Sequence, residues 1–243
     1  MPNIITITLN PALDKSISVP ELVPEKKLRA ISSKVEPGGG GINISRALKK
    51  LGVASEAIIL SGGYTGKTLE ALLDKEQVDF TAIATEGDTR ENFVVFDEDK
   101  KLQYRFGMPG EPVSNQELGL LMQAIGNCSH ADYIVVSGSL PPGTTSSVFH
   151  EIAIIAEQLN AKLIIDTSGE ALKAAVKEGL YLIKPNLREL ASLVGKEWIA
   201  ISDVIATARQ VIAAGSCKAM AVSMGADGAM LITATEQIGR AHV

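Results

Sequence analysis

The feature that most limits the possible folds is an alternation of short apolar segments with segments of helical periodicity along most of the chain. Such alternation is typical of a mainly parallel β-sheet with helices packed on its faces. Strands that are buried on both faces appear as short continuous apolar runs. Six runs of this kind are expected to form the core strands: Ile4–Leu9, Ala57–Leu60, Tyr133–Ser137, Leu163–Asp166, Tyr181–Ile183 and Ala219–Ser223. The sequence therefore predicts one α/β domain over residues 1–243.

Two of the helices between these strands carry clear local signals. In residues 41–51 the apolar side chains follow the i, i+3, i+4, i+7 spacing of a single helix face, which predicts the buried face: Ile44, Ala47, Leu48 and Leu51. Residues 114–117, Ser-Asn-Gln-Glu, have the residue types of a capping box, which predicts the start of a second helix.

Two regions interrupt the alternation and predict a small β-flap, or lid. Residues 16–35 contain extended segments and two prolines, and residues 81–106 are expected to form two or three strands joined by a turn at 97–100. Such strands could cover a pocket or pair with a second subunit through their edges.

Charge and cysteine content exclude several classes of partner. The net charge is −5, the pI is about 5.3, and no run of Lys or Arg is longer than two, so we expect no nucleic-acid partner. No apolar stretch approaches the roughly 18–20 residues of a membrane span, so we expect no membrane partner. Cys128 and Cys217 lack the spacing of a disulfide scaffold or a zinc site. Together these features predict a cytoplasmic protein.

Residues 36–43, Glu-Pro-Gly-Gly-Gly-Gly-Ile-Asn, are the densest motif. Consecutive glycines allow a ligand to reach backbone N–H groups at a helix N-terminus, where anions and hydroxyls bind well. A flexible connector would not need four glycines followed at once by a helix. The motif therefore predicts a ligand-binding loop.

Residues 61–68, Ser-Gly-Gly-Tyr-Thr-Gly-Lys-Thr, come close to the P-loop pattern and follow a predicted strand. Ser61 stands where the tight loop requires its first glycine. No convincing strand ending in aspartate follows to supply the magnesium partner. We therefore do not predict a P-loop here.

Residues 184–189, Lys-Pro-Asn-Leu-Arg-Glu, follow a strand directly, at the place where nucleotides and metal ions tend to bind in open α/β sheets. Asn186 and Glu189 offer oxygen ligands that suit hydrated Mg²⁺. The same two residue types also form an ordinary helix cap. The residues alone leave both readings open.

Two glycine-containing turns, Ser137–Gly143 and Ser223–Gly228, end buried strands. They either bind a ligand or serve only as sharp turns.

Arg90 and Arg105 lie in the second flap region and are candidates for binding a phosphate through bidentate hydrogen bonds. A solvated surface position is the alternative for each arginine.

Taken together, these motifs resemble the PfkB-type carbohydrate kinases of the ribokinase superfamily over nearly the whole chain. Residues 8–14, Thr-Leu-Asn-Pro-Ala-Leu-Asp, are similar to the first strand of that family and its substrate-binding aspartate. Gly38–Asn43 is similar to its sugar-binding glycine motif. Four further segments follow in family order: 137–143, 166–172, 184–189 and 223–228. The resemblance implies a ribokinase-like three-layer α/β/α domain with a β-flap.

Within the family the chain is most similar to the branch that phosphorylates fructose 6-phosphate. Its glycine run contains no lysine, and residues 103–109, Gln-Tyr-Arg-Phe-Gly-Met-Pro, supply the arginine expected near a 6-phosphate. The resemblance implies transfer of the ATP γ-phosphoryl group to the 1-hydroxyl of that sugar, which yields fructose 1,6-bisphosphate. Positioning and charge neutralisation would then carry the catalysis.

The resemblance also implies a role for individual residues. The sugar phosphate would be bound by Asp14, Lys27, Gly39, Gly40, Asn43, Arg90, Arg105 and Ser139. The nucleotide would be lined by Lys184, Asn186, Ser223, Gly225 and Gly228. Asn186 and Glu189 would hold Mg²⁺ through water. Lys27 matches a flap position that can reach the substrate of a neighbouring subunit. The exposed edges of the flap predict that the full-length protein is a homodimer through the flap.

The Gly-Ala-Gly-Asp motif, whose aspartate is the family's general base, does not occur in the 243 residues. The resemblance thus implies that the domain is incomplete at its C-terminus, that it contains no catalytic residue, that it is inactive as given and that an apolar patch is exposed. Residues 237–243 depart from the family pattern, and 238–243 resemble the translation of a sequencing adapter. We therefore expect a non-native tail there.

Other functions stay open. Tagatose 6-phosphate and fructose 1-phosphate are alternative substrates, because one sequence does not rank epimers at a single hydroxyl. A protein that binds sugar phosphate without catalysis is the alternative from another functional class.

Overall fold

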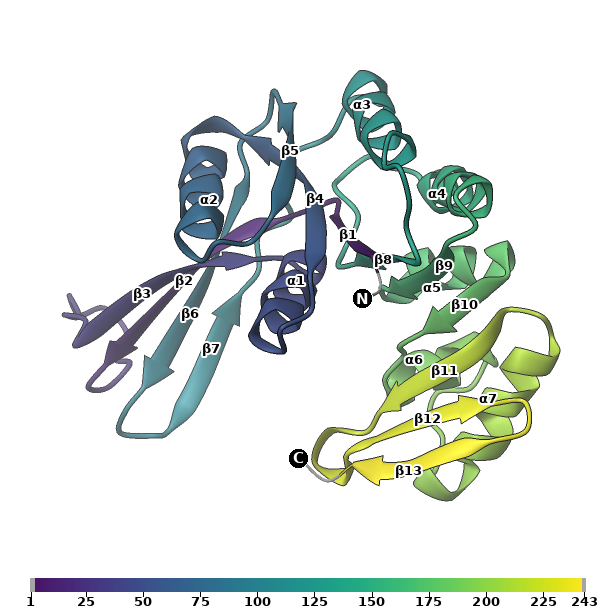
Figure 1. The fold of residues 1–243 in the computed structure, drawn as a ribbon. Helices are drawn as coiled ribbons and strands as arrows, with labels where there is room; N and C mark the ends of the chain where they lie inside the picture. Colours follow the sequence, from purple (N-terminus) through teal and green to yellow (C-terminus); the bar gives the residue numbers. More distant parts are fainter. Residues whose placement is uncertain (1–2, 242–243) are drawn as a thin grey trace.

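The computed structural model describes residues 3–241 and contains two β-sheets of different size (Figure 1). The large sheet has nine strands in the order β13-β12-β11-β10-β9-β8-β1-β4-β5. Their bounds are β1 (Ile4–Thr8), β4 (Ser55–Gly62), β5 (Phe80–Thr85), β8 (Tyr133–Ser137), β9 (Lys162–Asp166), β10 (Leu180–Ile183), β11 (Cys217–Ser223), β12 (Ala229–Thr233) and β13 (Gln237–Ala241). The order confirms the predicted α/β class, and all six predicted core strands belong to this sheet.

Helices cover the two faces of the large sheet unequally. Their bounds are α1 (Gly40–Lys50), α2 (Gly63–Lys75), α3 (Asn115–Gly126), α4 (Ser147–Gln158), α5 (Gly169–Ala175), α6 (Leu187–Leu193) and α7 (Val204–Ala213), with 3-10 turns η1 (Val176–Glu178), η2 (Ile201–Asp203) and η3 (Gly225–Asp227). From β1 the chain moves outward to β4 and β5, and from β8 it moves the other way to β11. Because parallel crossovers are right-handed, α1 and α2 lie on one face and α4 to α7 on the other.

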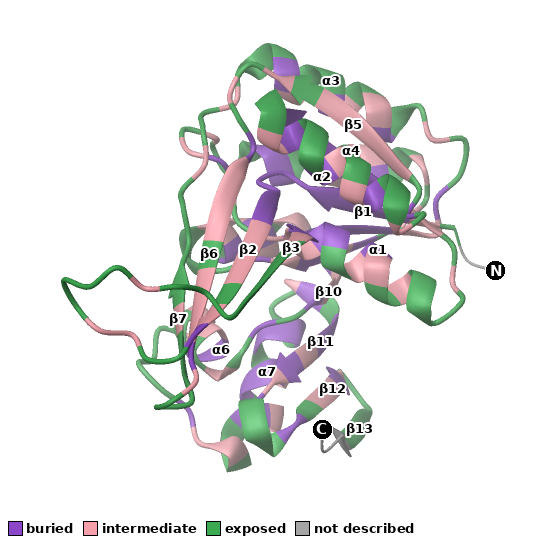
Figure 2. Cartoon of the chain, turned by 90° about the vertical axis from the view of Figure 1, so that its left-hand side faces the viewer, coloured by how far each residue is buried: buried purple, intermediate pink, exposed green. Residues whose placement is uncertain are grey.

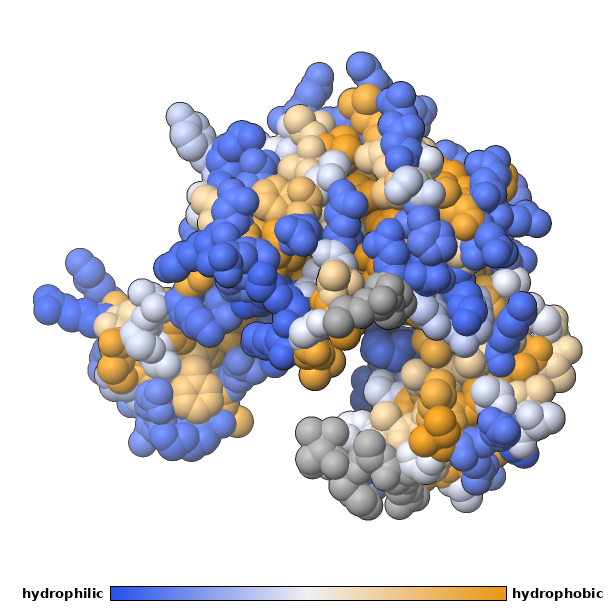
Figure 3. Space-filling view, viewed as in Figure 1, coloured by the Kyte–Doolittle hydropathy of each residue, from blue (hydrophilic) through white to orange (hydrophobic). Residues whose placement is uncertain are grey.

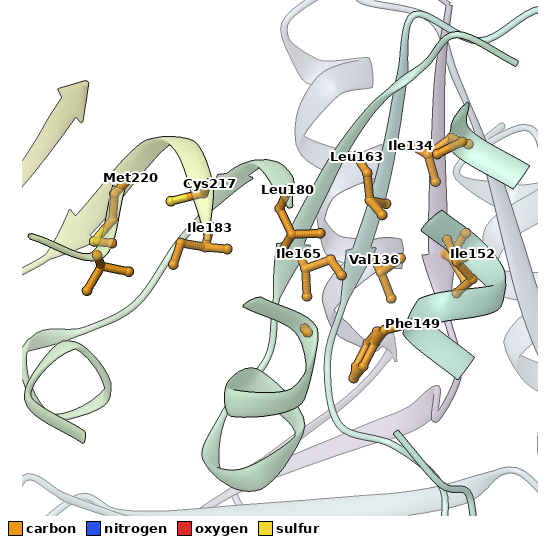
Figure 4. Packing of buried hydrophobic residues seen from close by; sticks show 14 of the residues in the cluster. Ile134, Val136, Phe149, Ile152, Leu163, Ile165, Leu180, Ile183, Cys217 and Met220 are labelled. Atoms are coloured by element: carbon orange, nitrogen blue, oxygen red, sulfur yellow. The ribbon is translucent and has the colours of Figure 1, made fainter. Parts of the chain in front are cut away.

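The main core lies between the large sheet and the helices on the α4 side, and a smaller buried cluster lies under α1 and α2. Alternate residues of β8 and β9 point toward α4, and Figure 4 shows Val136 and Ile165 beside its side chains Phe149 and Ile152. Phe149 is 1% exposed. Burying an aromatic side chain of this size is one of the larger single contributions to folding.

The opposite face of β9 to β12 has little helical cover. Register places Ile164, Leu182 and Ala219 in one row across this face, and Leu231 continues the apolar surface on β12. No described helix lies in front of β11 and β12 in Figure 1, and Figure 3 shows orange atoms there. Ile164, Leu182 and Leu231 are of intermediate exposure, so the described part of the chain leaves this apolar face partly accessible to solvent.

The small sheet has the order β3-β2-β6-β7, with β2 (Ala12–Val19), β3 (Ser32–Gly38), β6 (Arg90–Asp97) and β7 (Leu102–Phe106). It confirms the predicted flap but corrects its limits. The strands begin before residue 16 and extend past residue 35. Thr81–Thr85 belongs instead to β5, which pairs in parallel with β4. Its position follows from the β4-α2-β5 crossover, which the local pattern of β-forming residues does not reveal.

A buried carboxylate organises the far end of the small sheet. Asp97 is 0% exposed, and its oxygens accept hydrogen bonds from the backbone N–H groups of Lys100 at 2.9 Å and Leu22 at 3.1 Å. The hydrogen bond from Lys100 is the main cause that lowers the pKa of Asp97. These bonds close the predicted turn at 97–100 and anchor the start of the loop that carries Lys27.

The buried face of α1 differs from the predicted one. Gly41, Ile42 and Ser45 are its buried residues, whereas Leu51 is 77% exposed at the C-cap. The Ser45 hydroxyl pairs with that of Thr6 at 2.8 Å. Glycine at the start of α1 lets the helix approach β1 closely, so its contact surface is set by small residues and not by the apolar stripe.

The end of the chain forms part of the large sheet. Residues 237–241 make up β13, which pairs antiparallel with β12. The predicted non-native tail covers 237–243, and residues 242–243 lie outside the described residues. That this tail is non-native stays a prediction.

Among residues 3–241, none of the helices has the length and apolar character needed to cross a membrane.

We expect Phe149→Ala to lower the free energy of unfolding by about 3–5 kcal/mol, because it leaves a cavity where the side chain fills the core. Urea denaturation followed by circular dichroism measures the change. Ile154→Ala is the matched control, since Ile154 lies on the same helix but is 42% exposed. It should change the free energy by less than about 1 kcal/mol. Equal losses for the two variants would contradict this account of the core.

Candidate functional site

The carboxyl ends of the parallel strands meet at one edge of the large sheet and surround an open depression of about 330 Å³. We call it the sheet-edge depression. Its lining residues are Gly40, Ser137, Gly138, Ser139, Asp166, Thr167, Ser168, Lys184, Asn186, Glu189 and Ser223. Six sequence-predicted site residues are thus brought together: Gly40, Ser139, Lys184, Asn186, Glu189 and Ser223. Ligands of open α/β sheets bind at such an edge.

The glycine motif lies between the two sheets. A Cβ atom at Gly38 would overlap the carboxylate of Asp14, and one at Gly40 would overlap Ser137. Gly39 has a φ of 118°, which side-chain-bearing residues rarely adopt. The glycines are therefore required by packing, whatever ligand the motif also contacts.

Helix α1 begins at this motif with its positive end toward the sheet edge. Its N-cap Gly39 makes no side-chain capping bond, and its first turn contains no acidic residue. The Ile42 N–H donates to the hydroxyl of Thr8 at 3.0 Å. The dipole of α1 thus favours negative charge near Gly40, where the depression begins.

Asp166 is a site residue to which the sequence analysis gave no role. Its carboxylate accepts a hydrogen bond from the Ser137 hydroxyl at 3.1 Å and pairs with the Lys184 ammonium at 3.2 Å. Its position as the last residue of a buried strand was the available signal. The pair places one positive and one negative group side by side in the depression.

Asn186 and Glu189 form a complete capping box at the start of α6. The Asn186 side chain accepts from the Glu189 N–H at 2.9 Å, and the Glu189 carboxylate accepts from the Asn186 N–H at 2.8 Å. The capping role is therefore shown. Both side chains also line the depression near Asp166, and together they offer the oxygen donors that Mg²⁺ prefers.

Ser223, the last residue of β11, lines the depression, whereas the turn that follows it does not. The Ser223 N–H donates to the carbonyl of Pro185 at 3.0 Å, which holds β11 beside the start of α6. Gly225 and Gly228 close the turn by a backbone hydrogen bond at 3.0 Å. They do not line the depression.

The remaining predicted residues lie at the small sheet and the start of α1. Asp14 on β2 accepts a hydrogen bond from the Asn92 side chain at 2.9 Å. Asn43 is exposed on α1, and its side-chain oxygen accepts from Arg46 at 3.3 Å. Lys27 is exposed in the loop between β2 and β3, which forms part of the green periphery in Figure 2.

The two predicted arginines differ in their surroundings. Arg90 is half-buried and donates to the backbone carbonyls of Met108 at 2.7 Å and Asn10 at 3.1 Å. Burial lowers its pKa, while the charge of Asp14 acts in the opposite direction. Arg105 on β7 is exposed, and its Nε donates to Gln103 at 3.0 Å. Arg90 therefore has a structural role that the sequence did not indicate, and Arg105 is the freer cation.

Register places Arg105 and Asp14 on the same face of the small sheet. Asp14 is the cross-strand partner of Asn92, and Arg105 is the partner of Val94, two residues further along β6. Cross-strand partners point to one face, as do residues two apart in a strand. A carboxylate and a guanidinium thus share the polar face of this sheet.

The segment similar to a P-loop is unsuited to phosphate. A Cβ atom at Gly63, the first residue of α2, would overlap the Asp88 carboxylate. A negative group at the N-terminus of α2 repels a phosphate.

A further depression of about 650 Å³ lies at the other edge of the large sheet, beside Lys162 and Tyr181, and contains none of the predicted site residues.

Comparison with known proteins connects this arrangement to a family of kinases. The pattern of the pfkB family carbohydrate kinases matches residues 5–242. The chain is 38% identical over 231 residues to ATP-dependent 6-phosphofructokinase isozyme 2 of Escherichia coli (strain K12). The match spans 95% of this chain and 75% of that protein. It is also 30% identical over 230 residues to 1-phosphofructokinase of Bacillus subtilis (strain 168). That match spans 95% of this chain and 75% of the relative.

Solved structures agree with these relatives. Phosphofructokinase-2 from Escherichia coli in complex with fructose-6-phosphate matches with a TM-score of 0.92 and 36% identity over 100% of this chain and 80% of that chain. The tetrameric inhibited form of phosphofructokinase-2 from Escherichia coli matches with a TM-score of 0.92 and 38% identity. The match covers 98% of this chain and 79% of that chain. The sequence resemblance and the ribokinase-like fold that it implied are both confirmed. The chain belongs to the PfkB family of carbohydrate kinases, which transfer phosphate to a hydroxyl group of a sugar substrate.

Proposed function

We propose that this chain binds fructose 6-phosphate and MgATP, and that the reaction of its site is ATP-dependent phosphorylation of the sugar 1-hydroxyl. One observation carries the proposal: Asp14 and Arg105 share the polar face of the small sheet beside the glycine motif. A carboxylate that accepts hydrogen bonds from sugar hydroxyls and an exposed guanidinium that binds phosphate are the two groups a sugar phosphate requires.

The binding roles divide between the two sheets. Asp14, Asn43 and the backbone of Gly39 and Gly40 hold the sugar hydroxyls, while the phosphate end is bound by the arginines and Ser139. At the sheet-edge depression the Lys184 ammonium lies beside Asp166 and neutralises the phosphates of the nucleotide. Ser223 lies at the same edge. The small sheet excludes water from the sugar, which limits loss of ATP to hydrolysis.

The donors at the start of α6 fit a magnesium ion. Asn186, Glu189 and Asp166 present oxygen atoms to one depression, and Mg²⁺ keeps several of its water ligands in such sites. These residues would hold the ion through water. When bound, it supplies charge neutralisation for the phosphates.

The choice of fructose 6-phosphate rests on the relatives and on Arg105. The Escherichia coli relative is a 6-phosphofructokinase at 38% identity, and the Bacillus subtilis relative is a 1-phosphofructokinase at 30%. Tagatose 6-phosphate and fructose 1-phosphate remain the competing ligands. Binding is the suitable readout, because the general base that the family supplies is not among the 243 residues.

We expect isothermal titration calorimetry to show binding of fructose 6-phosphate, and Arg105→Ala to weaken it more than tenfold, because the variant loses a charge-assisted contact to phosphate. Lys101→Ala is the matched control. It removes the same charge from the exposed hairpin turn of the same sheet and should leave the affinity within about twofold. Tighter binding of tagatose 6-phosphate or fructose 1-phosphate would reassign the substrate, and an unchanged affinity in Arg105→Ala would refute its role.

A second prediction concerns the nucleotide. Glu189→Gln keeps a side-chain oxygen that accepts the Asn186 N–H, so the cap and the melting temperature should be preserved. The lost charge should weaken MgATP binding by about fivefold or more while leaving ATP without magnesium unaffected. Glu170→Gln, in the first turn of α5, is the control. Equal effects on ATP with and without magnesium would contradict a magnesium role for Glu189.

The other face of the small sheet supports association with a second copy. Ile17, Val35, Phe93, Leu102 and Phe106 are each at least 36% exposed, and the register places all five on this face. Exposed apolar patches of this kind mark interaction sites. We propose that a second copy covers the face, which would bring Lys27 of each subunit toward the substrate of the other.

We expect Phe93→Glu to convert the protein from a dimer to a monomer, because it places a charge in the middle of the apolar face. Sedimentation velocity measures the change. Leu51→Glu is the control, since it introduces the same charge at the 77% exposed end of α1 and should leave the dimer intact. A monomeric unmodified protein, or a Phe93→Glu variant that still associates, would show that this face is not the interface.

A further inference from the structure

Asn92 on β6 uses both polar groups of its side chain to join two parts of the small sheet. Its Nδ2 donates to Oδ1 of Asp14 on the neighbouring strand at 2.9 Å. Its Oδ1 accepts from the backbone N–H of Met108 at 3.2 Å.

The segment that Asn92 holds is also fastened to Arg90, at the start of β6, and to Asn10, which follows β1 of the large sheet. The Met108 carbonyl accepts from Arg90 at 2.7 Å, and the Pro109 carbonyl accepts from the side chain of Asn10 at 3.0 Å. Asn10 is 8% exposed, follows β1 and also donates to the hydroxyl of Ser139 at 3.2 Å. Hydrogen bonds thus lead from Asp14, through Asn92 and the 108–109 segment, to Ser139.

This connection constrains the Asp14 carboxylate. With Oδ1 held by Asn92, the carboxylate plane cannot rotate freely, and Gly38 fits directly against it. Among the side-chain hydrogen bonds of residues 3–241, none is made to Oδ2 of Asp14, so this oxygen remains available to a hydroxyl group. A preorganised acceptor binds more tightly than one that must be oriented on binding.

We propose that Asn92 is a positioning residue for sugar recognition: it orients Asp14 so that one carboxylate oxygen faces the sugar, and it couples this orientation to the segment that joins the small sheet to the large one. The inference rests on the proposed function, because it assigns Asp14 to the sugar. Nothing in the sequence motifs marked Asn92.

Two variants separate the two contacts. Asn92→Ala removes both. Asn92→Asp keeps an acceptor for the Met108 N–H but replaces the donor to Asp14 with a second carboxylate, and like charges in contact repel. If the bond to Asp14 is what matters, Asn92→Asp should weaken binding of fructose 6-phosphate at pH 7.5 by about tenfold or more, at least as strongly as Asn92→Ala. If Asn92 only holds Met108, Asn92→Asp should bind as the unmodified chain does.

Acidification provides a signature that a purely structural role would not produce. At about pH 5.5 a protonated side chain at position 92 can donate to Asp14 again, so Asn92→Asp should regain affinity relative to the unmodified chain, whereas Asn92→Ala should not. Arg90 and Glu36 also face Asp14, and both remain charged between these pH values. Glu36 stays ionised because the hydrogen bond from Lys34 lowers the pKa of its carboxyl group. The sugar phosphate itself titrates near pH 6, equally for every variant.

Calorimetric titration with fructose 6-phosphate is the experiment, with Ser18→Ala as the control. Ser18 lies on the same face of β2, away from Asp14, and its loss should leave the affinity unchanged. Affinities of Asn92→Asp and the unmodified chain within twofold at pH 7.5 would overturn the inference alone. No binding by the unmodified chain would overturn the proposed function and, with it, the role of Asn92 in sugar recognition.

Discussion

The close packing of the glycine motif is the constraint on which the rest of the site depends. Gly38 fits against Asp14, Gly40 fits against Ser137, and Gly41 fits against the backbone of Ile7. Any side chain at these positions would separate the small sheet, α1 and the large sheet from one another. Because they meet without a gap, the N-terminus of α1 reaches the sheet edge and a polar strand face stands beside it. The same atoms that allow the packing expose the backbone to a ligand.

The small sheet has chemically distinct faces because side chains alternate along each strand. One face carries Asp14, Asn92 and Arg105, while the other carries apolar side chains such as Phe93 and Phe106. A sheet attached to the domain at one end is stabilised by little core of its own. Hydrogen bonds at its base, from Arg90 and Asn10 to the 108–109 segment, therefore contribute much of what positions its polar face.

Local signals predicted the parts of the structure that depend on neighbouring residues. The core strands appeared as apolar runs, and both capping boxes, at Ser114 and at Asn186, form as their residue types indicate. The limits of the small sheet were harder to predict, because β5 and β6 both contain β-forming residues and only the crossover through α2 assigns β5 to the large sheet. The prediction of the buried face of α1 was wrong for a related reason. Gly41 and Ser45 form the contact of α1 with β1, and hydrophobic periodicity does not detect small residues.

The sequence by itself determined the fold class, the six core strands, two capping boxes and the resemblance to PfkB carbohydrate kinases, because these depend on periodicity and on motifs contiguous in the chain. Only the tertiary structure decided which polar groups meet. Asn92 contacts Asp14 across 78 residues of sequence through the parallel pairing of β2 and β6. Asp166 and Lys184 meet because β9 and β10 end at the same edge of the large sheet. Such contacts follow from strand order and register, which bring together residues that no local pattern connects.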